Sequence, residues 1–174
     1  MAEIPAGELA RRSVEASGLL FAQLEFQQAE TMMIYLSLPH EVETTAIVVR
    51  GWQEGKRVTA PQVLWESRQM IPVEIESLED DVAESPLGIR QPIRGEPTPV
   101  SQIDLVIVPG LAFDGQGNRV GRGRGFYDRF LARKEFRGVT CGLALEEQIV
   151  GEIETAPNDV RMKMVVTDRQ VRRF

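Results

Sequence analysis

The stretch Ile103-Asp104-Leu105-Val106-Ile107-Val108-Pro109 decides the expected fold. Apart from Asp104 and the closing proline it is an uninterrupted apolar run, which is typical of a strand buried on both faces of a parallel sheet. A glycine-rich segment, residues 110–125, follows it, and a helical pattern begins near Phe126. A strand that leads through a loop into a helix is the repeating unit of an open, mostly parallel α/β sheet.

Strand and helix patterns alternate on both sides of this run. Further strands are expected at residues 31–36, 58–61, 70–75, 139–145 and 164–167, and helices at residues 11–28, 44–54 and 126–134. Ser13 and Ser17 are candidate caps of the first helix. Residues 76–101, which are rich in proline, glycine and acidic residues, are expected to form a surface loop. The predicted architecture is therefore a three-layer αβα fold with a Rossmann-like, mostly parallel open sheet.

Length and composition limit the possible classes of protein. The 174 residues, 43% of them apolar, suit one compact domain with its own core. No apolar run approaches the roughly 18 to 20 residues that a membrane-spanning helix needs, and the first residues lack the order of a secretory signal. A net charge of −6 disfavours general binding to nucleic acid. We expect a cytoplasmic monomer without a membrane or nucleic-acid partner.

The only cysteine and the only histidine are each expected to be ordinary structural residues. Cys141 lies in an apolar run, which favours a buried strand position over a catalytic thiol. A single cysteine also excludes an intrachain disulfide. His40 follows the first predicted strand and cannot form a cluster of histidine metal ligands by itself, so a loop histidine is expected.

Basic charge is concentrated around the glycine-rich segment. Seven basic residues stand against two acidic ones between Gly117 and Arg137. In Gly121-Arg122-Gly123-Arg124-Gly125 the glycines let a backbone approach a ligand, and the helix that follows adds partial positive charge. Arginine can also form paired hydrogen bonds with phosphate or carboxylate. The segment is predicted to bind a phosphate chain, and a flexible turn with solvated arginines is the alternative.

Familiar nucleotide and nucleic-acid motifs fit this segment poorly. No Gly-Lys-Ser/Thr sequence closes the loop, and its glycines are not spaced as Gly-x-Gly-x-x-Gly. Glu146, about 20 residues further on, keeps a nicotinamide site as an alternative. Arg-Gly segments that bind nucleic acid usually come in disordered repeats, whereas this one is single and flanked by apolar structure.

Two aspartates are candidate magnesium ligands. Asp128 lies in the first turn of the predicted helix, and Asp159 lies on a loop before the last predicted strand. Mg²⁺ prefers one or two carboxylates together with phosphate oxygens and water. An aspartate paired with arginine is the alternative at Asp128. Because loops gather at the carboxyl ends of parallel strands, residues 37–43, 110–125 and 146–159 are expected to meet.

Residues 103–114 and Gly117-Asn118-Arg119-Val120-Gly121-Arg122-Gly123-Arg124-Gly125-Phe126-Tyr127-Asp128-Arg129 together resemble the signature of the 5-formyltetrahydrofolate cyclo-ligases, also called methenyltetrahydrofolate synthetases. The resemblance extends over roughly residues 13–168. It includes Tyr35-Leu36-Ser37-Leu38-Pro39, Glu41-Val42-Glu43-Thr44, Gly55-Lys56, Gln148 and Asn158-Asp159.

The resemblance implies ATP- and Mg²⁺-dependent closure of 5-formyltetrahydrofolate to 5,10-methenyltetrahydrofolate, with release of ADP and phosphate. The formyl oxygen would attack the γ-phosphate, and N10 would then expel phosphate from the resulting imidate. By motif position, the implied ATP-binding residues are Arg119, Gly121, Arg122, Gly123, Arg124, Gly125, Phe126 and Tyr127. Of these, Arg122, Arg124 and Tyr127 would be catalytic. Glu41 and residues Arg122, Gly123, Arg124, Gly125 and Phe126 would bind the folate, and Asp128 and Asp159 would hold Mg²⁺.

Three departures from the family pattern fall on the nucleotide side. A basic Lys-x-x-x-Arg helix usually precedes the first helix identified here, and neither Arg11 nor Arg12 fits that role. Gln62 stands where many relatives carry a basic residue, and Arg124 replaces the usual Lys or Gly. We therefore expect residues 1–174 to form a single cyclo-ligase-like domain without that basic helix. A non-catalytic or impaired folate- or nucleotide-binding relative is the alternative.

Overall fold

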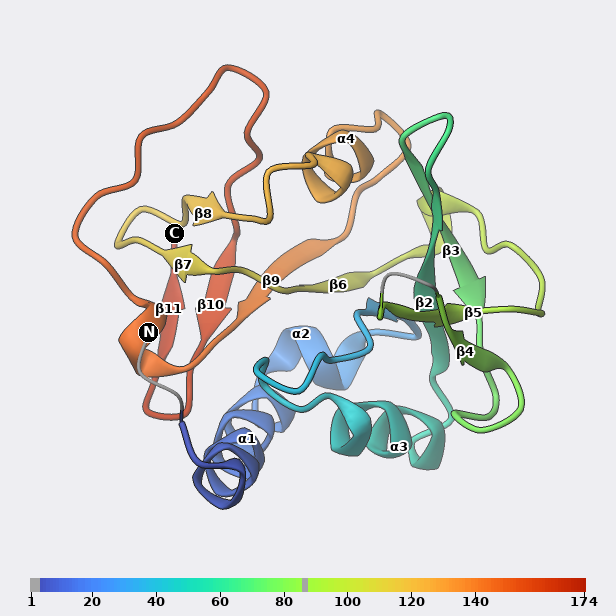
Figure 1. Cartoon of the computed structure of the whole chain (residues 1–174), viewed down its shortest axis with the longest axis horizontal. Coiled ribbons are helices and arrows are strands. Elements are labelled where there is room, and N and C mark those ends of the chain that lie inside the picture. The colour runs from blue at the N-terminus through green and yellow to red at the C-terminus, as the bar shows by residue number, and fades with distance from the viewer. Residues whose placement is uncertain (1–3, 86–87) are drawn as a thin grey trace.

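The computed structural model describes residues 4–85 and 88–174, which include a seven-stranded sheet (Figure 1). Its strand order is β11-β10-β9-β6-β1-β2-β3, and the five inner strands are parallel to one another. These strands are β1 (Thr31–Ile34), β2 (Arg57–Leu64), β6 (Leu105–Val108), β9 (Val139–Leu143) and β10 (Met164–Val166). The antiparallel edges are β3 (Gln69–Glu74) and β11 (Val171–Arg173). The predicted open, mostly parallel sheet is confirmed.

The apolar run that predicted the central strand is buried on both faces of the sheet. Leu105 and Ile107 of β6 belong to one core cluster, whereas Val106 and Val108 belong to the other. Because successive side chains point to opposite faces, both sets must be apolar when both faces are covered. This arrangement explains why β6 has no polar alternation.

The two faces of the sheet are covered unequally (Figure 1). Three helices cover one face, and α4 with a short hairpin covers the other. The three helices are α1 (Ala6–Phe21), α2 (Leu24–Gln28) and α3 (Thr45–Gln53). The thinner layer consists of α4 (Phe126–Leu131) and the hairpin of β7 (Ala112–Phe113) and β8 (Arg119–Val120). None of the described helices is long and apolar enough to cross a membrane.

The first helix differs from the prediction at both of its proposed caps. It starts at Ala6, five residues earlier than expected, and it ends at Phe21, so that α2 is a separate helix. Ser13 and Ser17 lie inside α1, where their hydroxyls donate to the carbonyl oxygens of Leu9 and Ser13, at 2.7 and 2.8 Å. Serine makes this bond to the preceding turn when it cannot reach a free amide at a helix start. The capping prediction was wrong.

The segment predicted as a surface loop, residues 76–101, contains regular structure. It includes the antiparallel pair β4 (Val82–Glu84) and β5 (Arg90–Pro92) and the 3₁₀ helix η1 (Val100–Gln102). Three-residue strands are too short for an alternating pattern to be recognised. The same reason explains why β7, β8 and β11 were not predicted. A second 3₁₀ helix, η2 (Glu146–Gln148), follows β9.

Candidate functional site

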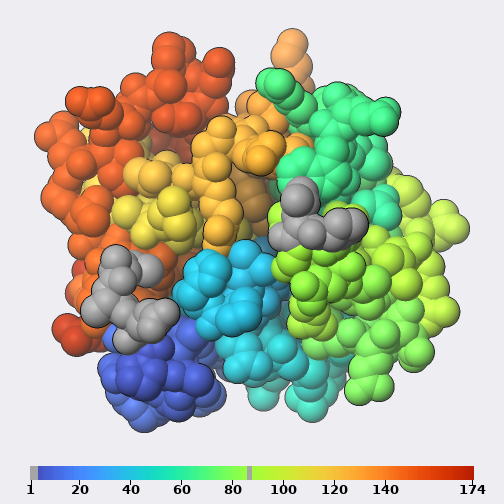
Figure 2. All heavy atoms as spheres, in the orientation of Figure 1, coloured from blue at the N-terminus to red at the C-terminus, as the bar shows by residue number. Residues whose placement is uncertain are grey.

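The three loops that were expected to meet surround one cavity at the carboxyl edge of the parallel strands. The cavity has a volume of about 590 Å³, which lies in the range of small-molecule pockets. In the space-filling view the loop after β1 lies directly below the glycine-rich segment (Figure 2). Every predicted site residue lines the cavity, namely Glu41, Arg119, Gly121, Arg122, Gly123, Arg124, Gly125, Phe126, Tyr127, Asp128 and Asp159.

The glycine-rich segment needs its glycines at three backbone positions. Gly117, Gly123 and Gly125 have φ values of 82°, 75° and 62°, in the left-handed region that side chains with a Cβ rarely adopt. Gly125 directly precedes α4, which has only six residues and ends at Leu131 rather than at Lys134. The predicted contribution of a helix dipole is therefore small. Positive charge at the cavity comes mainly from the arginine side chains.

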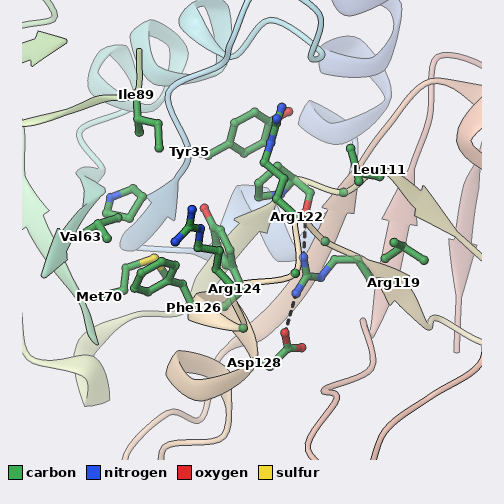
Figure 3. A pocket seen from close by; sticks show the side chains of 18 of the residues that line it. Tyr35, Val63, Met70, Ile89, Leu111, Arg119, Arg122, Arg124, Phe126 and Asp128 are labelled. Carbon is green, nitrogen blue, oxygen red and sulfur yellow. Dashed lines mark hydrogen bonds and ion pairs between the residues drawn. The ribbon is translucent and has the colours of Figure 1, made fainter. Parts of the chain in front are cut away.

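Arg119 is nearly buried in the cavity wall, with 6% of its side chain exposed. Its Nη2 donates to Oδ2 of Asp128 at 3.0 Å, and its Nη1 donates to the carbonyl oxygen of Pro109 at 3.3 Å (Figure 3). Its guanidinium carbon lies 5.6 Å from the centre of the Tyr127 ring. Its Nε has no hydrogen-bond partner within residues 4–85 and 88–174. Since a buried N–H without an acceptor is costly, Arg119 has one unsatisfied donor within the cavity wall.

Asp128 and Asp159 both face the cavity, and backbone contacts bring their segments together. Oδ1 of Asp128 accepts a hydrogen bond from the backbone N–H of Val160 at 3.3 Å, and Oδ2 of Asp159 accepts from that of Ala156 at 2.7 Å. The described chain contains no group of three or more metal-ligating side chains. Two carboxylates fit Mg²⁺ if phosphate oxygens and water supply the remaining ligands. The sequence left open whether Asp128 binds a metal or pairs with an arginine, and in this structure it is paired with Arg119.

The loop after β1 contacts the glycine-rich segment through Arg122. Nη2 of Arg122 donates to Oε1 of Glu41 at 3.2 Å and lies 2.6 Å from Nε2 of His40. The second carboxylate oxygen of Glu41 accepts from the backbone N–H of Leu38 at 3.0 Å. Both oxygens of Glu41 are therefore engaged within the protein. Each keeps further lone-pair capacity for a substrate amino group.

An aromatic and apolar wall completes the cavity, and the sequence did not predict it. The hairpin of β2 and β3 supplies Val63, Trp65 and Met70. Trp65 packs edge to face against Phe126 with ring centres 5.4 Å apart, and the guanidinium carbon of Arg124 lies 5.5 Å from the Trp65 ring centre. A tryptophan between two predicted strands, followed by polar residues, was the one signal that could have identified this wall.

Burial excludes two groups as bases or nucleophiles at neutral pH. It raises the pKa of the Tyr127 hydroxyl well above its ordinary value, so this side chain can act in the cavity only as a neutral hydrogen-bonding group. Burial likewise raises the pKa of the Cys141 thiol, and Cys141 lies in β9 without lining the cavity. The prediction of a buried strand cysteine is confirmed.

Four other residues noted in the sequence, Arg11, Arg12, Gln62 and Glu146, do not line the cavity. Arg12 is paired with Asp168 at 2.7 Å, and Arg11 pairs with Glu15 on the surface of α1. Gln62 donates to the carbonyl oxygen of Pro92 at 3.0 Å. Glu146, the basis of the nicotinamide alternative, binds Arg172 at 2.6 Å, and this bond lowers the pKa of its carboxyl to about 2. Its engagement with Arg172 removes the support for that alternative.

The fold and the cavity together define an α/β protein with an arginine-lined cavity at the carboxyl ends of parallel strands. The family model described as the 5-formyltetrahydrofolate cyclo-ligase family matches residues 2–168. The chain belongs to this family, as its sequence signature predicted.

Curated relatives and solved structures agree with this assignment. The chain is 32% identical over 173 residues to the 5-formyltetrahydrofolate cyclo-ligase of Mus musculus, covering 94% of this chain and 85% of the relative. It is 30% identical over 147 residues to that of Escherichia coli K12, covering 82% and 80%. The NMR structure of 5,10-methenyltetrahydrofolate synthetase from Aquifex aeolicus matches with a TM-score of 0.83 and 28% identity, covering 98% of this chain and 84% of that chain.

Proposed function

We propose that this protein converts 5-formyltetrahydrofolate to 5,10-methenyltetrahydrofolate with conversion of ATP to ADP and phosphate, in the presence of Mg²⁺; the formyl oxygen leaves with the phosphate. One observation carries the proposal: residues 109–111 and 119–128 of the family signature line a single cavity, where cations, carboxylates and an aromatic wall face one another. Membership in the cyclo-ligase family supports the reaction type. We infer that the enzyme acts as a cytoplasmic monomer.

The cationic side of the cavity suits a triphosphate. Arg119, Arg122 and Arg124 all line it, and the glycines between them expose backbone amides. Transfer of a phosphoryl group depends mainly on positioning and charge neutralisation, so no nucleophilic side chain is needed. The buried Nε of Arg119 lacks an acceptor among the described residues, and a shift of this side chain would let it donate to a phosphate oxygen. In this proposal the formyl oxygen of the substrate is the attacking group.

Asp128 and Asp159 would hold Mg²⁺ against the same phosphates. The ion would neutralise charge on the transferring group when it is bound. Arg119, which occupies one oxygen of Asp128 in this structure, would then turn part of its donor capacity toward phosphate. The two aspartates, through Mg²⁺, and Arg119 would thus neutralise the charge of the same phosphates.

The apolar side of the cavity suits the folate. Trp65 and Phe126 offer flat surfaces for a pterin or benzoyl ring, and Val63 and Met70 exclude water beside them. Glu41, at the junction with the cationic side, can accept hydrogen bonds from a pterin amino group. Substrate and nucleotide would therefore meet near Arg122.

A direct assay tests the proposal. Purified protein is given 5-formyltetrahydrofolate, ATP and Mg²⁺, and the methenyl product is followed by its near-ultraviolet absorbance. We expect product that depends on both ATP and Mg²⁺. If no product forms under any of these conditions, the chain is not an active cyclo-ligase.

The alternative of an impaired relative is favoured by the positions of Arg11, Arg12 and Gln62, none of which reaches the cavity. Gln62 in place of a basic residue removes one charge-assisted phosphate contact, worth roughly 1.5 to 3 kcal/mol, and would weaken ATP binding by a factor on the order of 10 to 10². Calorimetry separates the two cases. An impaired relative binds 5-formyltetrahydrofolate but binds ATP weakly, whereas tight ATP binding shows that the glycine-segment arginines suffice.

A further inference from the structure

The only histidine of the chain lies in the contact that joins two walls of the cavity. Nε2 of His40 is 2.6 Å from Nη2 of Arg122, and the same nitrogen of Arg122 donates to Glu41 at 3.2 Å. His40 belongs to the loop after β1, whereas Arg122 belongs to the glycine-rich segment. The sequence had indicated only an ordinary loop residue at this position.

The chemistry of the two side chains fixes the proton on His40. A guanidinium is always protonated in proteins and has donors but no acceptor. A close contact with Arg122 therefore requires that Nε2 of His40 accepts the hydrogen bond. The imidazole must be neutral and must carry its proton on Nδ1. Protonation of His40 would turn the acceptor into a donor and place two positive charges against each other.

Arg122 depends on these partners for its position over the cavity. Half of its side chain is exposed, and an exposed arginine loses rotamer freedom when it is held in one place. Glu41 is itself fixed, because its other oxygen accepts from the backbone N–H of Leu38. His40 and Glu41 thus form a prearranged pair of acceptors for one guanidinium nitrogen.

The charged groups around His40 do not compensate for its protonation. Arg122 faces it from the glycine-rich segment, and Glu41 and Glu43 are on its own loop. Glu84 and Arg90, from β4 and β5, line the groove next to this loop. A protonated His40 could pair with Glu41, but it would then compete with Arg122 for the carboxylate.

We infer that His40 is a positioning residue: its neutral imidazole, together with Glu41, holds Arg122 across the cavity, and its protonation releases Arg122 and weakens substrate binding. The identity of the substrate rests on the proposed function. The state of His40 in the free protein does not.

Binding of 5-formyltetrahydrofolate alone, measured by calorimetry between pH 8 and pH 5.5, tests the effect on the ligand. ATP is left out because phosphate groups titrate in the same range. We expect wild-type affinity to fall by about 10-fold toward pH 5.5, as expected for loss of a charge-assisted contact. His40→Gln, which keeps an acceptor but cannot be protonated, should bind equally well throughout. His40→Lys should bind weakly at every pH.

Gln53→Lys is the matched control, since it adds the same charge at the exposed end of α3 without altering the cavity. It should keep the wild-type pH profile. An unchanged pH slope in His40→Gln, or wild-type affinity in His40→Lys, would overturn the inference. Absence of folate binding at every pH would instead count against the proposed function.

A ligand-free measurement tests the contact itself. Because the chain has one histidine, ¹⁵N NMR at neutral pH detects a single imidazole. We expect its proton on Nδ1 in the wild type and loss of this preference in Arg122→Gln. A wild-type imidazole that carries its proton on Nε2 would contradict the inference whatever the protein binds.

Discussion

Arg12 and Arg119 are both almost buried, with 5% and 6% of their side chains exposed, but their partners differ. Arg12, on α1, donates from Nε to Asp168 at 2.7 Å and from Nη2 to Glu147. Arg119 has one carboxylate partner and an Nε without an acceptor in the described chain. A buried cation with its donors satisfied stabilises a fold, whereas a cation in a cavity wall with an unsatisfied donor has hydrogen-bonding capacity left for a ligand.

The pKa values of the partners agree with a structural role for Arg12. Its hydrogen bond is the main cause that lowers the pKa of the Glu147 carboxyl. Glu147 lies in η2 after β9, and Asp168 lies between β10 and β11. Arg12 therefore ties α1 to two loops at the edge of the sheet. Loss of the Arg12 side chain should lower the free energy of unfolding more than it lowers the rate of the reaction.

The largest expected effect is on stability, from Arg12→Met. Removing one partner of a buried ion pair leaves Asp168 uncompensated, which should lower the free energy of unfolding by about 3 to 5 kcal/mol. Urea denaturation measures the change. Arg11→Met is the matched control, because its pair with Glu15 is exposed and should contribute less than about 1 kcal/mol. Equal losses in both variants would show that Arg12 is not a structural anchor.

The next largest effect is expected on turnover, from Asp128→Asn. Loss of a charge-stabilising carboxylate beside the phosphates should reduce ATP-dependent turnover by at least about 10²-fold. The rate is measured at limiting and saturating Mg²⁺. Asp80→Asn, at an exposed position outside the cavity, is the control. A near-normal rate of Asp128→Asn at limiting Mg²⁺ would assign Asp128 to a structural ion pair with Arg119.

The stability of the fold in acid should depend on Glu146, which, like Arg12, forms an ion pair outside the cavity. Its hydrogen bond with Arg172 is the main cause of a folded-state pKa of about 2, below the ordinary value of 4.5. A lowered folded-state pKa gives stability that is fully present above the unfolded-state value and is lost as the pH falls from about 5 to about 2. The contribution should be about 2 kcal/mol after allowance for partial exposure.

Unfolding of Glu146→Gln across the same pH range provides the measurement. The variant should lose stability less steeply than the wild type between pH 5 and pH 2. Parallel curves would mean that other carboxylates, such as Asp114 with its lowered pKa, account for the acid sensitivity.

The smallest effect is expected from Trp65→Phe on the ligand side. The contact between Arg124 and Trp65 is a cation–π interaction at an accessible site, worth about 0.5 to 1 kcal/mol. Because phenylalanine keeps an aromatic face and part of this interaction, we expect the KM for ATP to rise by at most about 2-fold with kcat nearly unchanged. Trp52→Phe is the control, because Trp52 donates to the carbonyl oxygen of Ile75 and does not line the cavity. Equal changes in both variants would show that the contact between Trp65 and Arg124 does not contribute to ATP binding.

The sequence was sufficient for the features that local patterns encode. The run at β6 predicted the sheet because its burial on both faces leaves no polar alternation. The glycine-rich segment predicted one wall of the cavity because its composition and its place between strand and helix are local. The roles of its individual residues remain predictions.

Contacts between distant segments could not be predicted in the same way. Trp65 reaches Phe126 and Arg124 only because the β2–β3 hairpin lies beside α4. His40 and Arg122 are 82 residues apart in the chain, and no periodic pattern links them. The pairing of Arg12 with Asp168 likewise depends on how α1 packs against the sheet. Such side-chain partners follow from tertiary packing, which one sequence does not reveal.

The most direct test compares Arg119→Met with Arg12→Met in the formation of methenyltetrahydrofolate, at a temperature where both variants are folded. Rates are expressed per folded molecule. We predict that Arg119→Met loses at least about 10²-fold in ATP-dependent rate and that Arg12→Met stays within about 2-fold of the wild type. A near-normal rate for Arg119→Met, or an equal loss in Arg12→Met, would contradict the proposal that Arg119 binds the reacting phosphates.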